Sequence, residues 1–265
     1  MTQDTQSSFV RHEPCPSCNS RDNLARYSDG HAYCFGCEYR EPAVGEVNEF
    51  NNNKEKTDMI EGQVQALSKR QIDFDTAKFY NYQVGEYNGS PVQIAPYYDT
   101  NYLLVAQHIR IPNKDFIWLG DMNGVGLFGK HKWKGNQKMI TITEGEIDAM
   151  SVSKVQGNKW PVVSVPSGAK SAKKFIKKEL EYLESFQNVV LMFDNDEAGN
   201  AASIECAQLF SPKKALISKL PMKDANEMLV SNRGKDIIHY IWNAKPYTPE
   251  GIIAGADTWD LVIQD

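Results

Sequence analysis

Two stretches of the sequence, KMITITEGEIDAMSV at residues 138–152 and NVVLMFDNDEAG at residues 188–199, decide the fold. In each, a short apolar and β-branched run that favours a β-strand leads directly into acidic residues and then into a helical pattern. Apolar strands that alternate with helices are typical of a parallel sheet buried on both faces. The alternation of predicted strands and helices continues over 138–143, 144–156, 161–167, 170–185, 188–194, 196–210 and 214–221. We therefore predict an α/β domain here.

Acidic residues follow three of these predicted strands. Glu144 comes directly after the first strand, and Asp148 lies one helical turn later on the same side. Asp194 and Asp196 follow the third strand, where alternation would direct both carboxylates the same way, and Asp224 follows the fourth. Parallel sheets place ligand chemistry just beyond the carboxyl ends of their strands. Carboxylates gathered there repel one another unless hard cations neutralise them, and two Mg²⁺ ions can activate a hydroxyl and stabilise a leaving phosphate.

The alternative for each of these acids is an ordinary structural role. Any single Asp or Glu at the start of a helix is by default an N-cap or a solvated side chain. Their recurrence after three separate strands favours a metal site over this alternative.

Four of the five cysteines form two pairs, each with two residues between its members. Cys15 and Cys18 make the first pair, Cys34 and Cys37 the second, and 15 residues separate the pairs. This spacing is that of a four-cysteine zinc ribbon, in which two tight turns offer four thiolates to one structural Zn²⁺. Two disulfides are the alternative, but nothing in the sequence indicates export, and cytosolic thiols stay reduced.

The residues between the two cysteine pairs are predicted to form a hairpin, with its turn at 28–31, SDGH. A ribbon of about 40 residues buries little apolar surface, so the metal would supply most of its folding free energy. His31 at the turn is placed to touch a base, and a solvated turn histidine is the alternative. The fifth cysteine, Cys206, lies in a helical pattern and is expected to be a buried, inert thiol.

A polar segment and a basic region lie between the cysteines and the first acidic motif. Residues 46–58 are Asn-rich and almost without apolar side chains, which indicates a flexible linker. Residues 103–138 carry six Lys or Arg against two Asp, a net charge of +4, with aromatic residues among them. Such a composition suits a groove that holds a phosphate backbone and stacks bases. A solvated charged hairpin is the alternative.

The overall composition excludes some classes of protein. The chain has 265 residues and a formal net charge of −5, which argues against wholesale coating of nucleic acid by a basic surface. A cluster of carboxylates can nevertheless offset a local basic groove, so a negative net charge is compatible with such a groove. The best candidate for a buried strand, at 189–193, is far shorter than the ~18 apolar residues of a membrane span. No signal for secretion is present, so we expect a cytoplasmic protein with no membrane partner.

Two motifs carry a resemblance to a known fold. TEGEID at 143–148 and FDNDEAG at 193–199 resemble the glutamate and DxD motifs of the Toprim fold, which primases, topoisomerases and some nucleases share. The order of cysteine ribbon, linker, basic region and Toprim motifs resembles that of primases. Further strings are similar to the primase half of the bifunctional primase-helicases of T7-type bacteriophages, namely SDGH at 28–31, LFGKH at 127–131, KDANE at 223–227 and WNA at 242–244. The resemblance covers essentially the whole chain.

The resemblance implies an α/β fold, α+β overall, with several parts. These are a zinc-ribbon β domain at 1–45, a flexible linker at 46–58, a mixed α+β basic subdomain at 59–137, a Toprim catalytic subdomain with a mainly parallel sheet at 138–245, and the start of a linker toward a helicase domain at 246–265. No phosphate-binding loop of the helicase type is present. We therefore expect a fragment of a longer protein that is monomeric in isolation.

The resemblance also implies a set of site residues. The expected ligands of one structural Zn²⁺ are Cys15, Cys18, Cys34 and Cys37. The expected catalytic residues are Glu144, Asp148, Asp194, Asp196 and Asp224. Two Mg²⁺ ions, with Mn²⁺ as an alternative metal, are expected on Glu144, Asp194, Asp196 and Asp224. Nucleotide or template contacts are expected from His31, Arg110, Lys114, Lys130, His131 and Lys170. For Lys170, which lies where SGAKSA at 167–172 opens a helix, a solvated lysine beside a helix cap is the alternative.

The activity implied by the resemblance is that of a DNA primase, a nucleotidyltransferase that makes short RNA primers on single-stranded DNA for lagging-strand replication. A ribonucleotide 3′-hydroxyl would attack the α-phosphate of the next triphosphate, and the zinc ribbon would select the template. Expected partners are single-stranded DNA, ribonucleoside triphosphates and, in a full-length protein, a hexameric helicase domain and the replicative DNA polymerase. A Toprim-type metal-dependent nuclease and a non-catalytic, zinc-dependent DNA-binding adaptor are the alternatives.

Overall fold

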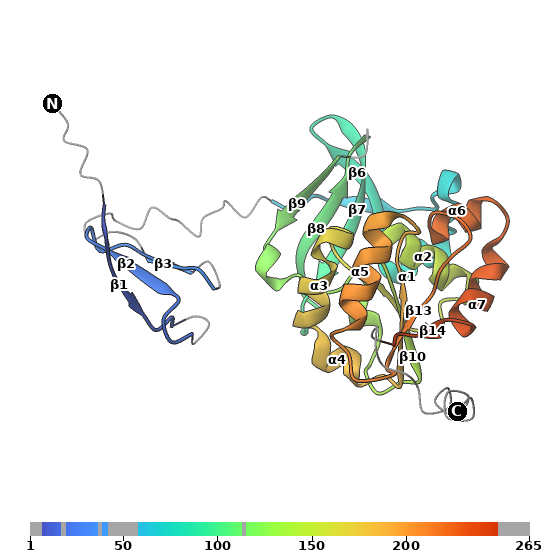
Figure 1. The fold of residues 1–265 in the computed structure, drawn as a ribbon. Helices are drawn as coiled ribbons and strands as arrows, with labels where there is room; N and C mark the ends of the chain where they lie inside the picture. Colours follow the sequence, from blue (N-terminus) through green and yellow to red (C-terminus); the bar gives the residue numbers. More distant parts are fainter. Residues whose placement is uncertain (1–6, 17–19, 37–38, 42–57, 113–114, 249–265) are drawn as a thin grey trace, which may run out of the picture. The chain divides into compact units, whose positions relative to one another are not determined.

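The structure is a computed structural model that describes residues 7–16, 20–36, 39–41, 58–112 and 115–248 (Figure 1). The chain divides into two compact units, Met1–Glu55 and Lys56–Asp265, which are described separately. Of the predicted linker, residues 46–57 lie outside the described residues. So does the predicted linker toward a helicase domain, apart from its first three residues.

The first unit contains a small antiparallel sheet in the order β1-β2-β3-β4. Its strands are β1 (Phe9–Glu13), β2 (Leu24–Tyr27), β3 (Ala32–Cys34) and β4 (Arg40–Glu41). The predicted hairpin turn joins β2 to β3, and Gly30 adopts a φ of 88°, a left-handed conformation that glycine tolerates without strain. The fold of this unit is therefore a short meander with one tight turn at its centre.

The second unit begins with a five-stranded antiparallel sheet in the order β5-β6-β7-β8-β9. The strands are β5 (Gly62–Val64), β6 (Gln83–Tyr87), β7 (Ser90–Tyr98), β8 (Leu104–Arg110) and β9 (Phe116–Gly120). The helix α1 (Phe74–Tyr80) lies between β5 and β6, and the Asp73 side chain caps it by accepting a hydrogen bond from the Thr76 amide at 2.9 Å. The basic region of the sequence thus lies largely on β8, β9 and the segments that follow them.

The second sheet of this unit has the order β11-β10-β12-β13-β14. Four strands are parallel, namely β10 (Met139–Thr143), β11 (Val162–Ser164), β12 (Asn188–Met192) and β13 (Ala215–Ile217), and the short β14 (Lys245–Pro246) is antiparallel to β13. The central strands β10 and β12 are buried along almost their whole length, as continuous apolar strands require. The mainly parallel sheet expected from the sequence is confirmed.

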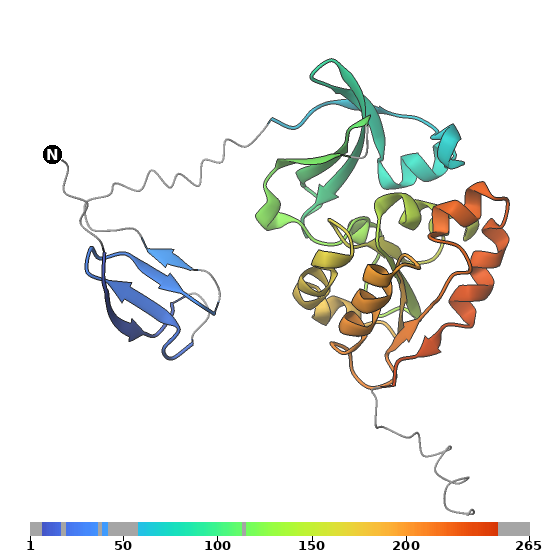
Figure 2. The same ribbon diagram turned by 45° about the horizontal axis from the view of Figure 1, so that its top comes forward.

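Helices cover both faces of the parallel sheet (Figures 1 and 2). On one face α3 (Ala169–Lys178) packs against α5 (Glu197–Ala207), with α4 (Leu180–Glu184) beside α3. On the other face α2 (Glu146–Val155) packs against α1, α6 (Ala225–Val230) and α7 (Gly234–Trp242). The helices that follow β10 and β12 thus leave on opposite faces. This arrangement opens a crevice at the carboxyl ends of the two strands.

The single helix predicted over 170–185 is instead two helices that meet at Glu179. The buried Glu179 carboxylate pairs with the Lys130 ammonium at 2.5 Å. An amphipathic pattern cannot reveal such a break, because it depends on a partner that lies 49 residues away in the chain.

One continuous apolar core joins the two sheets of the second unit. The buried Tyr80 hydroxyl donates a hydrogen bond to the Val162 carbonyl at 3.0 Å, which ties α1 to β11. The Phe128 amide donates to the Ser164 carbonyl at 2.9 Å and closes the outer edge of β11. The two sheets therefore form one packed body around the crevice. In the part of the chain that the structure describes, no helix is both long and apolar enough to span a membrane.

Candidate active site

Four of the five predicted catalytic acids line one cavity of about 650 Å³ in the second unit. Glu144 follows β10, Asp148 lies in the first turn of α2, Asp194 follows β12, and Asp224 precedes α6. The parallel sheet brings them together because the carboxyl ends of its strands meet at one edge. We call this space the acid cavity.

Backbone amides at helix starts hold three of these acids. The Glu144 carboxylate accepts a hydrogen bond from the Ala169 amide at 3.1 Å, Asp148 accepts one from the Asn226 amide at 3.0 Å, and Asp224 caps α6. Helix N-termini carry partial positive charge, so they favour carboxylates at these positions.

Asp194 is placed by backbone packing. A Cβ atom added at Gly199 in α5 would lie 2.2 Å from the Asp194 carbonyl oxygen, so only glycine allows α5 to approach this closely. Among the described residues, the Lys223 ammonium is the cation paired with the Asp194 carboxylate, at 3.7 Å.

The acids of the cavity destabilise one another's charged forms. Burial, the charge of Glu144 and the charge of Asp224 raise the pKa of Asp194 to about 7. Burial and the charge of Asp224 raise the pKa of Asp148 well above its ordinary value. Both effects favour protonation of the carboxylates unless a cation offsets them. Oxygen donors that repel one another are the donor set that hard divalent cations require, so these residues fit Mg²⁺ by their chemistry.

The carboxylates do not yet form a coordination sphere. Among the described residues, no group of three or more His, Cys, Asp or Glu side chains is close enough to hold a metal ion as it stands. Glu144 accepts a hydrogen bond from the Ala169 amide, and Asp224 accepts one from the Glu227 amide. Side-chain rotation would therefore accompany metal binding here.

Asp196, the fifth predicted acid, is not among the residues that line the acid cavity. It is the N-cap of α5 and accepts a hydrogen bond from the Gly199 amide at 2.9 Å. The prediction that Asp194 and Asp196 point the same way assumed that the strand continues through them. In the structure β12 ends at Met192 and the chain turns at 195–196, so strand alternation does not apply.

A second wall of the acid cavity comes from the antiparallel sheet and was not predicted in full. Arg110 was predicted as a nucleotide or template contact, and Phe116 and Trp118 belong to the aromatic residues of the predicted basic groove, whereas His108 was not predicted. The Arg110 guanidinium lies 5.3 Å from the centre of the Phe116 ring. His108 and Arg110 are two residues apart on β8 and therefore share a face. The alternation of side chains along a strand was therefore the signal in the sequence that could have identified His108, because it places His108 on the same face as Arg110.

The other predicted nucleotide or template contacts are distributed differently. Lys170 is exposed in the first turn of α3, near Gly168, which lines the acid cavity. Lys130 is held in the ion pair with Glu179. His131 packs against Tyr98 with ring centres 4.2 Å apart, and burial together with the charge of Lys132 lowers the pKa of His131 to about 4. Neither Lys130 nor His131 lines the acid cavity. Lys114 lies outside the described residues.

Two of the predicted zinc ligands can be placed in the first unit. Cys15 and Cys34 are buried and belong to its small apolar core. The Cys15 amide donates to the Ser20 carbonyl at 2.9 Å, and the Cys34 amide donates to the Tyr39 carbonyl at 2.8 Å. Each bond closes a loop around one Cys-x-x-Cys pair, which suits two tight zinc-binding turns. Cys18 and Cys37 lie outside the described residues.

His31 lies on the hairpin turn of the first unit with about a third of its side chain exposed. Its Nδ1 atom is 2.6 Å from an Asp29 carboxylate oxygen, and its ring stacks on Tyr27 with centres 4.2 Å apart. The imidazole therefore has a defined orientation at the surface.

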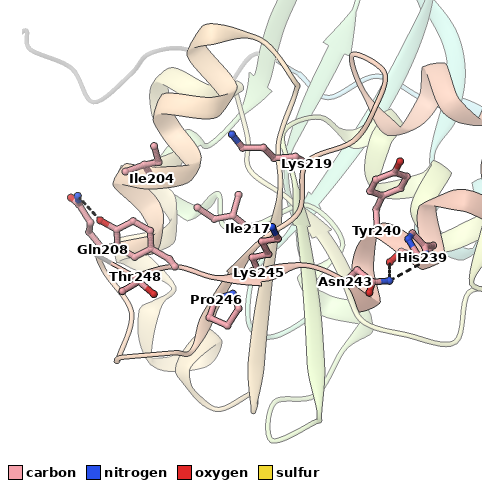
Figure 3. Close-up of a pocket in the computed structure, with 11 residues that line it drawn as sticks. Ile204, Gln208, Ile217, Lys219, His239, Tyr240, Asn243, Lys245, Pro246 and Thr248 are labelled. Atoms are coloured by element: carbon pink, nitrogen blue, oxygen red, sulfur yellow. Dashed lines mark hydrogen bonds between the residues drawn. The ribbon is translucent and has the colours of Figure 1, made fainter. Parts of the chain in front are cut away.

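A larger cavity, of about 990 Å³, lies between α5, α7 and β14 (Figure 3). Ile204, Ile217 and Tyr240 line it together with two lysines, and the Gln208 side chain donates to the Tyr247 hydroxyl at 3.1 Å. None of the described residues that line this cavity is acidic, and none was a predicted site residue. The size of a cavity therefore does not identify the site here, whereas the convergence of titratable groups does.

Residues 62–120 match a family model described as bacteriophage T7 DNA helicase/primase, N-terminal α+β fold, and residues 141–229 match one described as Toprim-like. The DNA helicase/primase of Enterobacteria phage T3 is 36% identical over 275 residues, which cover 99% of this chain and 48% of that protein. The chain thus spans about half the length of this curated relative.

Solved structures agree with these matches. The crystal structure of the primase fragment of the bacteriophage T7 primase-helicase matches with a TM-score of 0.68 and 35% identity, covering 88% of this chain and all of the fragment. A structure of the bacteriophage T7 lagging-strand DNA polymerase interacting with two primase domains bound to an RNA/DNA hybrid also matches. There the TM-score is 0.67 and the identity 40%, over 70% of this chain and 94% of the matched chain.

Proposed function

The chain belongs to the family of T7-type bacteriophage DNA primases, which are DNA-directed RNA polymerases, and on that premise we propose that it makes short RNA primers on single-stranded DNA. The observation that carries the proposal is the acid cavity itself. Four acids from the parallel sheet and its helices share this cavity with Arg110 and aromatic side chains from the antiparallel sheet. Phosphoryl transfer to a nucleotide hydroxyl needs both a site for divalent cations and a surface that holds a polyanion.

Divalent cations would be held by Glu144, Asp194 and Asp224, with Asp196 at the edge of the site. Mg²⁺ is the preferred ion by donor chemistry, and Mn²⁺ is the alternative. Two bound ions would activate the attacking 3′-hydroxyl and neutralise charge on the leaving pyrophosphate. Asp148, held by the Asn226 amide, would orient its neighbours in the site.

The chain's own cations would hold the triphosphate. Arg110 lines the acid cavity and presents several donors in a planar fork that matches phosphate oxygens. Lys223 also lines the cavity, near Asp194. The exposed Lys170 would approach from the start of α3. Charge neutralisation and alignment of the two reacting groups would provide most of the rate enhancement.

The first unit would supply template recognition. Cys15, Cys18, Cys34 and Cys37 would hold one Zn²⁺ that stabilises the small sheet. His31, oriented by Asp29 and Tyr27, would contact a template base by its exposed edge. We also propose that a full-length protein carries a hexameric helicase domain and works with a replicative DNA polymerase in the cytoplasm of a bacterial host. The full length of the phage T3 relative and the polymerase complex of phage T7 support this.

A synthesis assay tests the proposal. The protein is incubated with Mg²⁺, single-stranded DNA of varied sequence and labelled ribonucleotides, and short RNA products are expected. Glu144→Ala and Asp194→Ala should abolish synthesis but leave DNA binding intact. Degradation of the template without RNA synthesis would support a nuclease instead, and DNA binding without either reaction would support an adaptor.

A further inference from the structure

Glu146 lies between two expected catalytic acids in the sequence and also lines the acid cavity, but its carboxylate binds side chains of the antiparallel sheet. The side chain is buried, and one oxygen, Oε1, accepts a hydrogen bond from the Tyr97 hydroxyl at 2.8 Å. The same oxygen lies 2.6 Å from Nδ1 of His108. Tyr97 and His108 belong to β7 and β8, so Glu146 connects the acid-bearing helix α2 to the antiparallel sheet.

The hydrogen-bond geometry assigns the roles within this group of three. The Tyr97 hydroxyl donates to Oε1 of Glu146, so this oxygen is an acceptor, and Nδ1 of His108 contacts the same oxygen.

The His108 ring has two aromatic neighbours. It stacks on Trp118 with ring centres 4.3 Å apart and on Phe116 with ring centres 4.8 Å apart. Trp118 is itself fixed by a hydrogen bond from its indole nitrogen to the Ser167 hydroxyl at 3.3 Å. The imidazole thus already stacks on two aromatic rings of the protein. Its remaining edge carries Nε2, which has no hydrogen-bond partner among the described residues.

The hydrogen bond at Nδ1 decides what Nε2 can do. Because the Glu146 carboxylate only accepts, Nδ1 carries the hydrogen, and in the neutral ring Nε2 is left with a lone pair. A lone pair in a cavity lined by acids is matched by a hydroxyl donor and not by a phosphate oxygen. In a nucleotide the hydroxyl donors nearest to the α-phosphate are those of the sugar.

We propose that His108, positioned by Glu146 and Tyr97, accepts a hydrogen bond from the ribose 2′-hydroxyl and so selects ribonucleotides over 2′-deoxyribonucleotides. The inference rests on the proposed function, because it assumes that nucleotides react in the acid cavity. His108 lines that cavity, and the carboxylate that orients it lies between Glu144 and Asp148 in the sequence. In this assignment Glu146 is a positioning residue and not a metal ligand.

The test compares extension of a preformed RNA dinucleotide by a ribonucleoside triphosphate and by its 2′-deoxy analogue, with kcat/KM as the measure. The wild type should prefer the ribonucleotide, and His108→Ala should reduce that preference by about 10- to 100-fold, the range expected when a site loses its partner for a substrate hydroxyl. The loss should fall on the ribonucleotide alone. Glu146→Gln should reduce the preference less, because its amide can still accept from Nδ1.

A matched pair of tyrosine variants separates selectivity from stability. Tyr97→Phe and Tyr80→Phe each remove one buried hydroxyl that donates a hydrogen bond in the same core. Only Tyr97→Phe should lower the ribonucleotide preference, by roughly 3- to 10-fold on the scale of one neutral hydrogen bond. An equal effect of both variants would overturn the inference.

The wild-type protein by itself provides a further test of the inference, which does not depend on whether any variant folds. In the wild type, kcat/KM should be at least about 10-fold lower for the 2′-deoxy analogue than for the ribonucleotide, which is the preference assigned to His108. The inference is wrong, although the protein is a primase, if the wild type uses ribonucleotides and 2′-deoxyribonucleotides equally well. It is also wrong if activity depends only on the 3′-hydroxyl at the primer end. If the wild type makes no RNA from any ribonucleotide, the proposed function itself fails.

Discussion

The two units of the chain differ most in what they bury. Among its described residues, the first unit has a core of four side chains, Cys15, Leu24, Ala32 and Cys34, with Tyr39 packed against it. The second unit has a continuous apolar core that spans two sheets and the helices on both faces of one of them. Burial of apolar surface stabilises a fold in proportion to its area, so the first unit gains far less from it. Metal ions are therefore expected to serve folding in the first unit and chemistry in the second.

Removal of zinc should give the largest contrast between the units. Structural zinc contributes on the order of 10 kcal/mol of binding free energy, more than a core of this size can replace. A chelator, or Cys34→Ser, should therefore unfold residues 7–41 and leave the second unit unchanged. Amide hydrogen exchange followed separately in the two units measures this. If β2 and β3 keep their protection from exchange after zinc removal, the claim that zinc stabilises the first unit is wrong.

Asp194→Asn should separate activity from stability in the second unit. Synthesis should fall by roughly 10²- to 10³-fold or more, the scale of losing one preorganised electrostatic contact. The thermal midpoint of the metal-free protein should rise at the same time, because one of the repelling carboxylates is gone. Asp236→Asn, in an exposed ion pair with Arg233 on α7, is the control and should change neither quantity. A fall in both activity and thermal midpoint would mean that Asp194 has a structural role.

The second unit should become less stable as the pH rises when divalent cations are absent. Because folding raises the pKa of Asp194 to about 7, the proton on this side chain stabilises the folded state. This contribution to the free energy of unfolding is fully present below the ordinary pKa of about 4 and is lost as the pH passes 7. The free energy of unfolding should fall by about 1–3 kcal/mol between pH 5 and pH 8. Urea denaturation with EDTA measures the loss, and Mg²⁺ should restore more stability at pH 8 than at pH 5. Equal effects of Mg²⁺ at both pH values would argue against the acid cavity as the binding site.

His31→Ala should have the smallest effect on stability and a selective effect on function. The side chain is partly exposed and stacks on Tyr27, so the free energy of unfolding of the first unit should change within the range of surface substitutions, about 0.5 kcal/mol. Template-directed synthesis should fall while extension of a preformed primer is retained. Loss of both reactions to the same extent would place His31 outside template recognition.

The fold was predictable because its signals are local in the sequence. The apolar runs at 139–143 and 188–192 are β-strands in the structure, and the acids that follow them lie at the carboxyl ends, as parallel topology requires. The break at Glu179 was not predicted, and an N-cap role was named for Asp196 only as the alternative to metal binding. Both depend on where the chain turns and on which partner meets the side chain, and periodicity contains neither.

The candidate site was predictable in full on one wall only. Acidic motifs mark the wall that the parallel sheet provides, and the functional roles of these acids stay predictions. On the other wall Arg110 and Trp118 belong to the predicted basic groove, but His108 looks like an ordinary strand residue until β8 and β9 are placed against α2. Lys130 shows the opposite case, because a lysine in a basic stretch proved to be the partner of Glu179.

The sequence by itself determined the two-part organisation, the parallel sheet and the positions of the acids, because spacing and hydrophobic pattern encode strands, helices and cysteine pairs over short distances. Only the tertiary structure decided which residues face the acids. Glu146 has the same local pattern as Glu144 but points to Tyr97 and His108, which are 49 and 38 residues earlier in the chain. The reason is physical, since a buried carboxylate adopts the orientation that gives it hydrogen-bond donors, and the packing of two sheets supplies those donors.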